Sequence, residues 1–304
     1  MSVAADDEGS GDRRFPVDRL AAFSSHGSGG NPAGVVLLDT LPQAGEMQAL
    51  AAQIGYSETV FAAPQDNSWR VRYFAPKAEV AFCGHATIAL GAVLAARRGG
   101  RIFRLRLNNA IITVEGWGKA GTMSAALVSP PAASRPASLE LVEDALRLFS
   151  LTDADLDPRI PPAVAHAGAP HLILALRDRA RLASLSYEFA AGRDLALREG
   201  ICTFNIVQAE GSRRFHARNP FPFGGVYEDA ATGAAAAALA GYLRTIGWPH
   251  GGAIEVVQGE DMGMPSLLHV AISSDLADGL RVSGEVRWLA DPGAAGIESG
   301  REAL

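Results

Sequence analysis

Two stretches of the chain are apolar on every side rather than along one face. Residues 82–97 (FCGHATIALGAVLAAR) and residues 231–244 (ATGAAAAALAGYLR) contain no Asp, Glu or Lys, and each reaches an Arg only at its end. Their many Ala and Leu residues favour helix, and a helix without a polar stripe has to be enclosed by other elements. Both are shorter than the roughly 20 residues that span a bilayer. The pattern therefore predicts two thin helices, each buried inside a strongly curved sheet.

Alternating apolar and polar positions predict strands on both sides of these helices. In the first half they are residues 15–23, 33–38, 57–61, 69–74, 102–107, 111–115 and 123–128. In the second half they are residues 163–167, 171–176, 202–208, 213–218, 253–258, 267–272 and 279–288. Surface helices are predicted at residues 42–54 and 139–149, with two helical pieces within 177–196. A turn is expected at 76–82, an irregular segment at 219–230, and a Pro-, Ala- and Ser-rich linker at 129–138.

The two halves share one order of elements, which indicates an internal duplication. A shift of 148 positions places Ala86 on Ala234, Leu94 on Tyr242 and Gly99 on Gly247. We therefore expect an α+β fold of two pseudo-symmetric domains, each with a curved, mostly antiparallel sheet around a central apolar helix. The expected division is a disordered tail at 1–14, an N-terminal domain at 15–128 completed by the C-terminal strand at 279–290, the linker, and a C-terminal domain at 139–278.

Composition and charge narrow the class of protein. The 304 residues are 48% hydrophobic and 20% charged, with a net charge of −6, as in a globular protein. The sequence has no block of Lys and Arg residues, so nucleic acid is not expected as a partner. Two cysteines, Cys83 and Cys202, make no disulfide framework and favour a reducing compartment, so a cytoplasmic location is expected. The polar N-terminal segment does not resemble a signal peptide, and no membrane contact is expected.

Three ionisable residues lie near the starts of the two predicted buried helices: Glu58, His85 and Asp229. Each alone has a structural explanation, as an exposed strand end, a core histidine or a helix cap. Their convergence is more informative, because unpaired N–H groups and the helix dipole make a helix start a good receptor for an anion. Two such starts facing one cleft would bind a carboxylate. The Gly-rich loop at 24–31 lacks the Gly-Lys-Ser/Thr of a phosphate loop and precedes a predicted strand, so a nucleotide site is not indicated.

A set of short motifs resembles one known family. In chain order they are residues 30–35 (GNPAGV), 57–59 (SET), 74–76 (FAP) with Glu79, 82–87 (FCGHAT), 228–233 (EDAATG) and 258–259 (QG) with 262–263 (MG) and 265–266 (PS). Together they are similar to the PhzF-like (phenazine biosynthesis) family, which shares the diaminopimelate epimerase fold. The similarity spans about residues 15 to 290.

The resemblance implies a cofactor-independent isomerase that moves a proton and a double bond on a small carboxylate-bearing substrate between two similar domains. Glu58 corresponds to the family's acid–base residue, and His85 and Asp229 to its supporting residues. The resemblance further implies that the substrate is bound by Asn31, Ser57, Gly84, His85, Thr232, Gly233 and Ala234. No metal or cofactor is expected, and we expect a homodimer.

Three positions depart from the family pattern. Ala230 replaces a Pro, Ala234 replaces a Ser whose hydroxyl would face the pocket, and Met264 replaces an Arg. The departure at Ala234 weakens the expectation that the substrate is the phenazine precursor. The loss of a guanidinium at Met264 would remove an anion contact or a structural ion pair.

Four alternatives stay open at this level. A non-catalytic protein could keep the cleft and bind a small carboxylate. An amino-acid racemase would need two thiols, but Cys202 falls within a predicted strand and only Cys83 is at a helix start. A cysteine hydrolase on Cys83 and His85 is disfavoured because residues two apart on a helix do not face each other. A metal site built from Cys83, His85, His166 and His171 lacks the usual ligand spacings.

Overall fold

The computed structural model describes residues 15–119 and 122–290. Its helices are α1 (Ala44–Ile54), α2 (Gly84–Arg98), α3 (Leu139–Leu148), α4 (Arg179–Ala183), α5 (Phe189–Glu199) and α6 (Gly233–Thr245). Its strands are β1 (Asp18–Ser24), β2 (Asn31–Leu37), β3 (Glu58–Gln65), β4 (Ser68–Ala75), β5 (Ala78–Val80), β6 (Arg101–Arg106), β7 (Ile111–Lys119), β8 (Thr122–Pro131), β9 (Ala133–Pro136), β10 (Ala163–His166), β11 (Pro170–Leu176), β12 (Thr203–Ala209), β13 (Arg214–Arg218), β14 (Pro220–Phe221), β15 (Val226–Glu228), β16 (Ala253–Gln258), β17 (Ser266–Ala271) and β18 (Gly279–Trp288). Within these ranges, no helix is both long and apolar enough to cross a membrane. The tail predicted at 1–14 lies outside the described residues.

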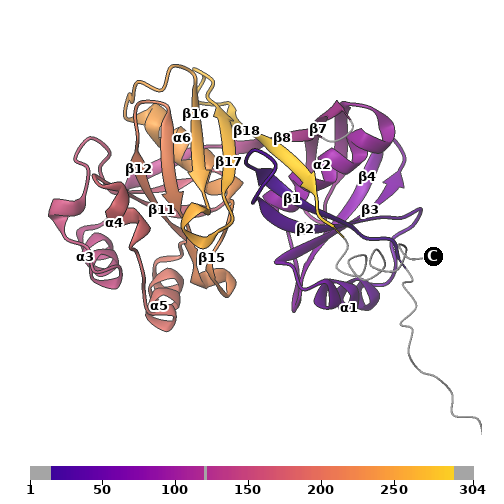
Figure 1. The fold of residues 1–304 in the computed structure, drawn as a ribbon, viewed down its shortest axis with the longest axis horizontal. Coiled ribbons are helices and arrows are strands. Elements are labelled where there is room, and N and C mark those ends of the chain that lie inside the picture. Colours follow the sequence, from indigo (N-terminus) through magenta and orange to yellow (C-terminus); the bar gives the residue numbers. More distant parts are fainter. Residues whose placement is uncertain (1–14, 120–121, 291–304) are drawn as a thin grey trace, which may run out of the picture.

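Apart from the β14–β15 pair, the strands form one continuous sixteen-stranded sheet, whose two curved halves share β18. In the N-terminal half, β1, β2, β3, β4, β6, β7, β8 and β18 pair in that order, and β18 also pairs with β1, so this half closes on itself around α2. In the C-terminal half the path continues from β18 through β17, β16, β13, β12, β11 and β10 to β9, and it curves around α6. Figure 1 shows the two halves as separate lobes, with β8 and β18 running between them.

The pairing pattern of one half is repeated in the other, which confirms the predicted pseudo-symmetry. The pairs β1–β2 and β10–β11 are antiparallel, and the following pairs β2–β3 and β11–β12 are parallel. The next pairs, β3–β4 and β12–β13, are antiparallel, and β4–β6 and β13–β16 are parallel. Each buried helix lies in the chain segment that links the two strands of the second parallel pair. Helix α2 lies between β4 and β6, and α6 lies between β13 and β16.

Both central helices are enclosed along their length. Every residue of α2 from His85 to Ala95 is buried, as is every residue of α6 from Ala235 to Leu243. Small residues let the sheet approach closely, and a Cβ added to Gly116 of β7 would lie 2.3 Å from the backbone oxygen of Gly91 in α2. The remaining helices cover the outer faces of the sheets, with α1 against β3 and β4 and α4 against β11 and β12.

Three local predictions from the sequence are wrong. The expected turn at 76–82 contains the short strand β5, and the expected irregular segment at 219–230 contains the hairpin of β14 and β15. The expected linker at 129–138 is mostly strand, because β8 extends to Pro131 and β9 pairs with β10. In the described sheet β9 is an edge strand, and an edge tolerates Pro because its outer N–H groups need no strand partner.

Candidate active site

The starts of α2 and α6 face one cleft. This cleft has a volume of about 950 Å³ and mostly apolar walls, and both halves of the protein line it. Gly84 and His85 come from the first turn of α2, and Thr232, Gly233 and Ala234 come from the start of α6. The placement of the two helix starts at a shared cleft is the arrangement that the sequence predicts.

At both helix starts, backbone N–H groups lack an acceptor within the helix. Neither N-cap residue, Cys83 for α2 or Thr232 for α6, makes a side-chain cap to its own helix. The first hydrogen bonds of the two helices are donated by the N–H groups of Thr87 and Ala236. The N–H groups before these residues have no intrahelical acceptor and carry the positive end of the helix dipole. The cleft can therefore bind a carboxylate between the helices.

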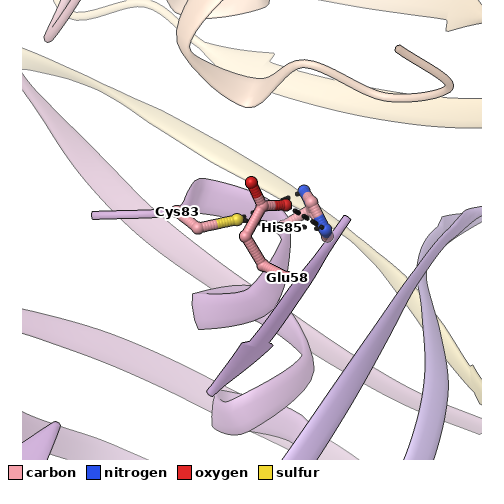
Figure 2. Close-up of side chains that lie close together, drawn as sticks. All are labelled: Glu58, Cys83 and His85. Carbon is pink, nitrogen blue, oxygen red and sulfur yellow. Dashed lines mark hydrogen bonds and ion pairs between the residues drawn. The ribbon is translucent and has the colours of Figure 1, made fainter. Parts of the chain in front are cut away.

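Glu58 is the first residue of β3, and it places a carboxyl group at this cleft. Its side chain is 18% exposed, and its Oε2 lies 3.5 Å from the Nε2 atom of His85. The hydroxyl of Ser57 lies 3.3 Å from the same nitrogen. Figure 2 shows the carboxyl group of Glu58 close to both the imidazole of His85 and the thiol of Cys83. The carboxylate therefore has one neighbouring imidazole and access to the cleft.

The surroundings of His85 favour one tautomer. Its Nδ1 lies 3.3 Å from the thiol of Cys83 and 3.3 Å from the amide nitrogen of Asn31. Burial, followed by the charge of Glu58, raises the pKa of the Cys83 thiol well above its ordinary value, so the thiol stays protonated. The two N–H groups of Asn31 are directed at Asp229 and Ala231, so the protonated thiol is the donor to Nδ1. In a neutral imidazole the proton is on Nε2, the nitrogen that faces Glu58 and Ser57.

Asp229 lies on the other side of Asn31. The Asn31 amide donates to Asp229 Oδ1 at 2.7 Å and to the backbone oxygen of Ala231 at 3.2 Å, and the Thr232 hydroxyl donates to Asp229 Oδ2 at 2.6 Å. Burial raises the pKa of Asp229 above its ordinary value, although His85 and the Thr232 hydrogen bond oppose this effect. Asn31 thus lies between the carboxyl group of Asp229 in one half and the imidazole of His85 in the other.

Most of the residues expected at the site line the cleft. They are Ser57, Glu58, Gly84, His85, Asp229, Thr232, Gly233 and Ala234. Asn31 is not among the lining residues, because it is buried and its amide is held by Asp229 and Ala231. Ala234 lines the cleft, whereas Ala230 is buried and neither Ala230 nor Met264 is part of the lining.

The structure corrects two arguments about cysteine. Cys83 and His85 do face each other, because Cys83 is an extended N-cap residue with φ −142° and ψ 120° and the helix begins only at Gly84. Cys202 precedes β12 and lines the cleft rather than lying inside a strand. However, burial and then Asp229 raise the pKa of Cys202 to about 11, and the pKa of Cys83 is raised as well. Two protonated thiols are poor bases and nucleophiles, which disfavours a two-thiol racemase and a cysteine hydrolase.

One group of side chains could hold a metal ion. In the described part of the chain, Glu58, Cys83 and His85 bring ligand atoms within 4.8 Å of one another, whereas the set considered from the sequence, which included His166 and His171, is not gathered. A metal would need the Cys83 thiolate and a lone pair on a ring nitrogen of His85. The raised pKa of the thiol opposes the first requirement. This trio therefore fits a hydrogen-bonded group better than a resident metal site.

Sequence reasoning missed several residues of the cleft wall, among them Lys77, Thr203 and Cys202, and it considered His171 only as a metal ligand. Lys77 lies in the segment expected to be a turn. His171 and Thr203 lie in apolar strands, where a single polar residue gives no sign of facing a cavity. A side-chain hydrogen bond between neighbouring strands, found here between His171 and Thr203, becomes visible only once the strand register is known.

Comparisons with known proteins agree with this architecture. The profile of a family described as phenazine biosynthesis-like protein matches residues 20–287. An uncharacterised isomerase of Deinococcus radiodurans is 36% identical over 238 residues, covering 75% of this chain and 76% of that protein. The trans-2,3-dihydro-3-hydroxyanthranilate isomerase of Pseudomonas fluorescens is 31% identical over 256 residues, covering 82% of this chain and 87% of that enzyme. The crystal structure of a PhzF-family phenazine biosynthesis protein from Bacillus anthracis matches with a TM-score of 0.79 at 19% identity, covering 91% of this chain and 97% of that one.

Proposed function

The chain belongs to the phenazine biosynthesis-like protein family and is an isomerase, and we propose that it moves a proton and a double bond within a small carboxylate by acid–base catalysis at Glu58. The observation that supports this mechanism most is the position of the Glu58 carboxyl group. It lies at a mostly apolar cleft, beside His85 and next to the uncapped starts of both central helices.

Substrate binding follows from the helix starts. The substrate carboxylate accepts hydrogen bonds from the N–H groups at the starts of α2 and α6, where the dipoles also favour negative charge. Removal of a proton from a carbon conjugated to that carboxylate spreads negative charge onto the carboxylate oxygens. Donors already fixed around those oxygens stabilise this charge without reorganising, which lowers the barrier to proton removal.

Glu58 then carries the proton between two carbons. As a carboxylate it takes a proton from one carbon, and the electron pair of the C–H bond becomes part of the shifted double bond. As a carboxylic acid it returns the proton at the far end of the conjugated system. The substrate keeps its composition, and Glu58 ends in the form in which it began. A general base in this position contributes typically about 10²–10⁴-fold to the rate.

His85 and Asp229 support this transfer. The Nε2–H group of His85 faces the Glu58 carboxylate at 3.5 Å and orients it. The raised pKa of Asp229 makes its protonated form available as a second proton donor, supplied by the C-terminal half. Asn31 holds Asp229 by an amide hydrogen bond and contacts the imidazole of His85, and it does not itself line the cleft.

The test uses the substrate named for the Pseudomonas fluorescens relative, trans-2,3-dihydro-3-hydroxyanthranilate. The protein and this compound are incubated in deuterated water, and deuterium in the product is followed by NMR and mass spectrometry. We expect one deuterium to be incorporated by the native protein. Glu58→Gln keeps the shape of the side chain but removes the base, so incorporation should fall by about 10²-fold or more.

Glu143→Gln on the exposed face of α3 is the matched control and should keep the native rate. Full deuterium incorporation by Glu58→Gln would remove Glu58 from the mechanism. Binding of the compound without any incorporation by the native protein would favour the alternative of a carboxylate-binding protein, or another substrate for the site. Ala234 lines the cleft at a position where the family usually has a hydroxyl, so these outcomes also bear on which substrate the site accepts.

A further inference from the structure

One buried polar atom in the cleft wall has no role in the mechanism above. His171 of β11 lines the cleft and is 1% exposed. Its Nδ1 lies 2.7 Å from the hydroxyl oxygen of Thr203 on the neighbouring strand β12. Its Nε2 is buried and has no hydrogen-bond partner in the described part of the protein. A buried polar atom without a hydrogen-bond partner destabilises the folded state, so native proteins rarely leave one unpaired.

The partners of Thr203 determine which nitrogen of His171 carries the proton. The Thr203 hydroxyl donates to Asn219 Oδ1 at 2.7 Å. Its only proton is then used, so toward His171 it acts as an acceptor. The Nδ1 atom of His171 must therefore be the donor. In a neutral imidazole this leaves Nε2 with a lone pair, which makes it a hydrogen-bond acceptor.

The orientation of Asn219 is in turn fixed by backbone groups. Gln258 donates from Nε2 to the backbone oxygen of Asp229 at 2.7 Å and accepts at Oε1 from the backbone N–H of Thr232 at 3.2 Å, so its amide can point only one way. The Asn219 amide nitrogen faces two acceptors, Gln258 Oε1 at 3.3 Å and Asn205 Oδ1 at 3.4 Å. Its oxygen must then be the atom that faces Thr203. The tautomer of His171 is thus set by a chain of bonds that begins at the start of α6.

The ring also remains neutral at ordinary pH. Burial, followed by the charge of His166, lowers the pKa of His171 to about 3. An acceptor that does not take up a proton from water can be satisfied only by a donor group from a molecule in the cleft or by a trapped water molecule. A substrate carboxylate cannot play this part, because it also is an acceptor.

We propose that His171 is a specificity-determining residue, whose Nε2 accepts a hydrogen bond from a hydroxyl or amino group on the body of the substrate. The proposal rests on the proposed function, which places the substrate carboxylate at the helix starts of the same cleft. The substrate class is then a small carboxylic acid that carries an O–H or N–H donor. A site built around an acceptor rejects an analogue without the donor, because that acceptor would stay unpaired.

The first experiment needs no variant and no substrate. Nitrogen-15 NMR of the ring nitrogens distinguishes a protonated from an unprotonated imidazole nitrogen. For His171 we expect a protonated Nδ1 and an unprotonated Nε2, unchanged between pH 8 and pH 5. The signals are assigned from their loss in His171→Phe. A proton on Nε2, or a titration within this pH range, would overturn the proposal.

The second experiment compares ligands that differ only in the donor. The probes are the three hydroxybenzoates and the three matching methoxybenzoates, which suit a mostly apolar cleft with a carboxylate receptor. For at least one isomer we expect the hydroxy compound to bind the native protein at least tenfold more tightly than its methoxy analogue, and to shift the Nε2 signal of His171. In His171→Phe this preference should fall to about twofold or less, while the methoxy compounds keep their affinity.

His269→Phe changes an exposed imidazole on β17 that is not part of the cleft lining, and it should keep the native preference. Equal binding of each hydroxy and methoxy pair by the native protein, with no shift of the Nε2 signal, would mean that Nε2 pairs with a trapped water only. The result of these ligand-binding tests does not depend on the result of the deuterium-exchange test of the proposed function. Failure at His171 would leave exchange through Glu58 intact, and failure of Glu58→Gln to stop exchange would leave the tautomer and the ligand preference unchanged.

Discussion

At the scale of single residues, the hydrogen-bond partners decide what each side chain of the cleft can do. Asp229 illustrates this, because it accepts from both Asn31 and Thr232 and yet has a raised pKa. Hydrogen bonds to a carboxylate normally lower its pKa, so here burial has the larger effect. The residue is held in place by donors and is still ready to carry a proton. That combination suits a residue that exchanges protons during a reaction.

This environment predicts how stability depends on pH. Above the ordinary pKa of an aspartic acid, about 4, the unfolded chain has lost the Asp229 proton and the native protein has not. The native state then binds more protons, so the free energy of unfolding contributed by this group falls as pH rises through the window up to the raised pKa. Asp229→Asn should remove this fall. The measurement is the free energy of unfolding in guanidinium chloride at several values between pH 4 and pH 7.

Asp194→Asn provides the comparison, because it changes an exposed aspartate on α5. It should leave the slope of unfolding free energy against pH as it is in the native protein. Each unit of pKa difference is worth about 1.4 kcal/mol, so the difference between the two variants also measures how far the pKa is raised. Parallel curves for the native protein and Asp229→Asn would show that burial does not raise the pKa of Asp229.

At the scale of elements, the first central helix, α2, packs closely against β7. Gly91 of α2 and Gly116 of β7 meet there, and a Cβ on Gly116 would lie 2.3 Å from the backbone oxygen of Gly91 and 2.7 Å from the Cβ of Ala95. Backbone atoms cannot turn aside as a flexible side chain can. The helix would have to move away from the sheet, and its start at the cleft would move with it.

Gly116→Ala should therefore destabilise the protein by about 1–3 kcal/mol, the usual cost of overpacking. It should also weaken binding of the carboxylate probes, because Gly84 and His85 move. Gly45→Ala is the opposite case, since a Cβ there meets nothing within 4 Å and Gly45 lies exposed in α1. That change should stabilise by up to about 1 kcal/mol. Chemical denaturation measures the free energy of unfolding of both variants. Equal changes in the two variants would mean that the structure around Gly91 adjusts to the added Cβ without cost.

The elements also show what the sequence can and cannot reveal. The two central helices were predictable because a helix of Ala and Leu without a polar stripe has only one stable place, inside the sheet. Glu58, His85 and Asp229 were predictable because they lie in motifs beside those helix starts. The position of Asn31 was not, because its partner Asp229 lies 198 residues away and only the fold brings them together. The contact between Cys83 and His85 was missed for a local reason, since it depends on the helix beginning one residue after Cys83.

At the scale of the whole molecule, the two halves are joined by more than a connecting chain. Strand β18 pairs with β8 and β1 in the N-terminal half of the sheet and with β17 in the C-terminal half (Figure 1). Buried residues of both central helices belong to one continuous apolar core, which includes Leu90 of α2, Leu239 of α6 and Val282 of β18. Unfolding one half would remove β18 from the sheet of the other and expose part of that shared core. The cleft therefore lies between two halves that depend on each other for stability.

This dependence predicts cooperative unfolding across the molecule. Leu239 is fully buried in the C-terminal half, and Leu239→Ala should cost about 2–5 kcal/mol. If the halves are coupled, Trp69 of β4 in the N-terminal half and Trp248 beyond α6 should then unfold together at a urea midpoint lower by roughly 1 M. Fluorine NMR of the protein labelled with 5-fluorotryptophan follows each Trp separately. Leu90→Ala is the reciprocal change and should move both signals in the same way. A midpoint that shifts for Trp248 alone in Leu239→Ala, and for Trp69 alone in Leu90→Ala, would show that the halves unfold independently and that sharing β18 does not couple them.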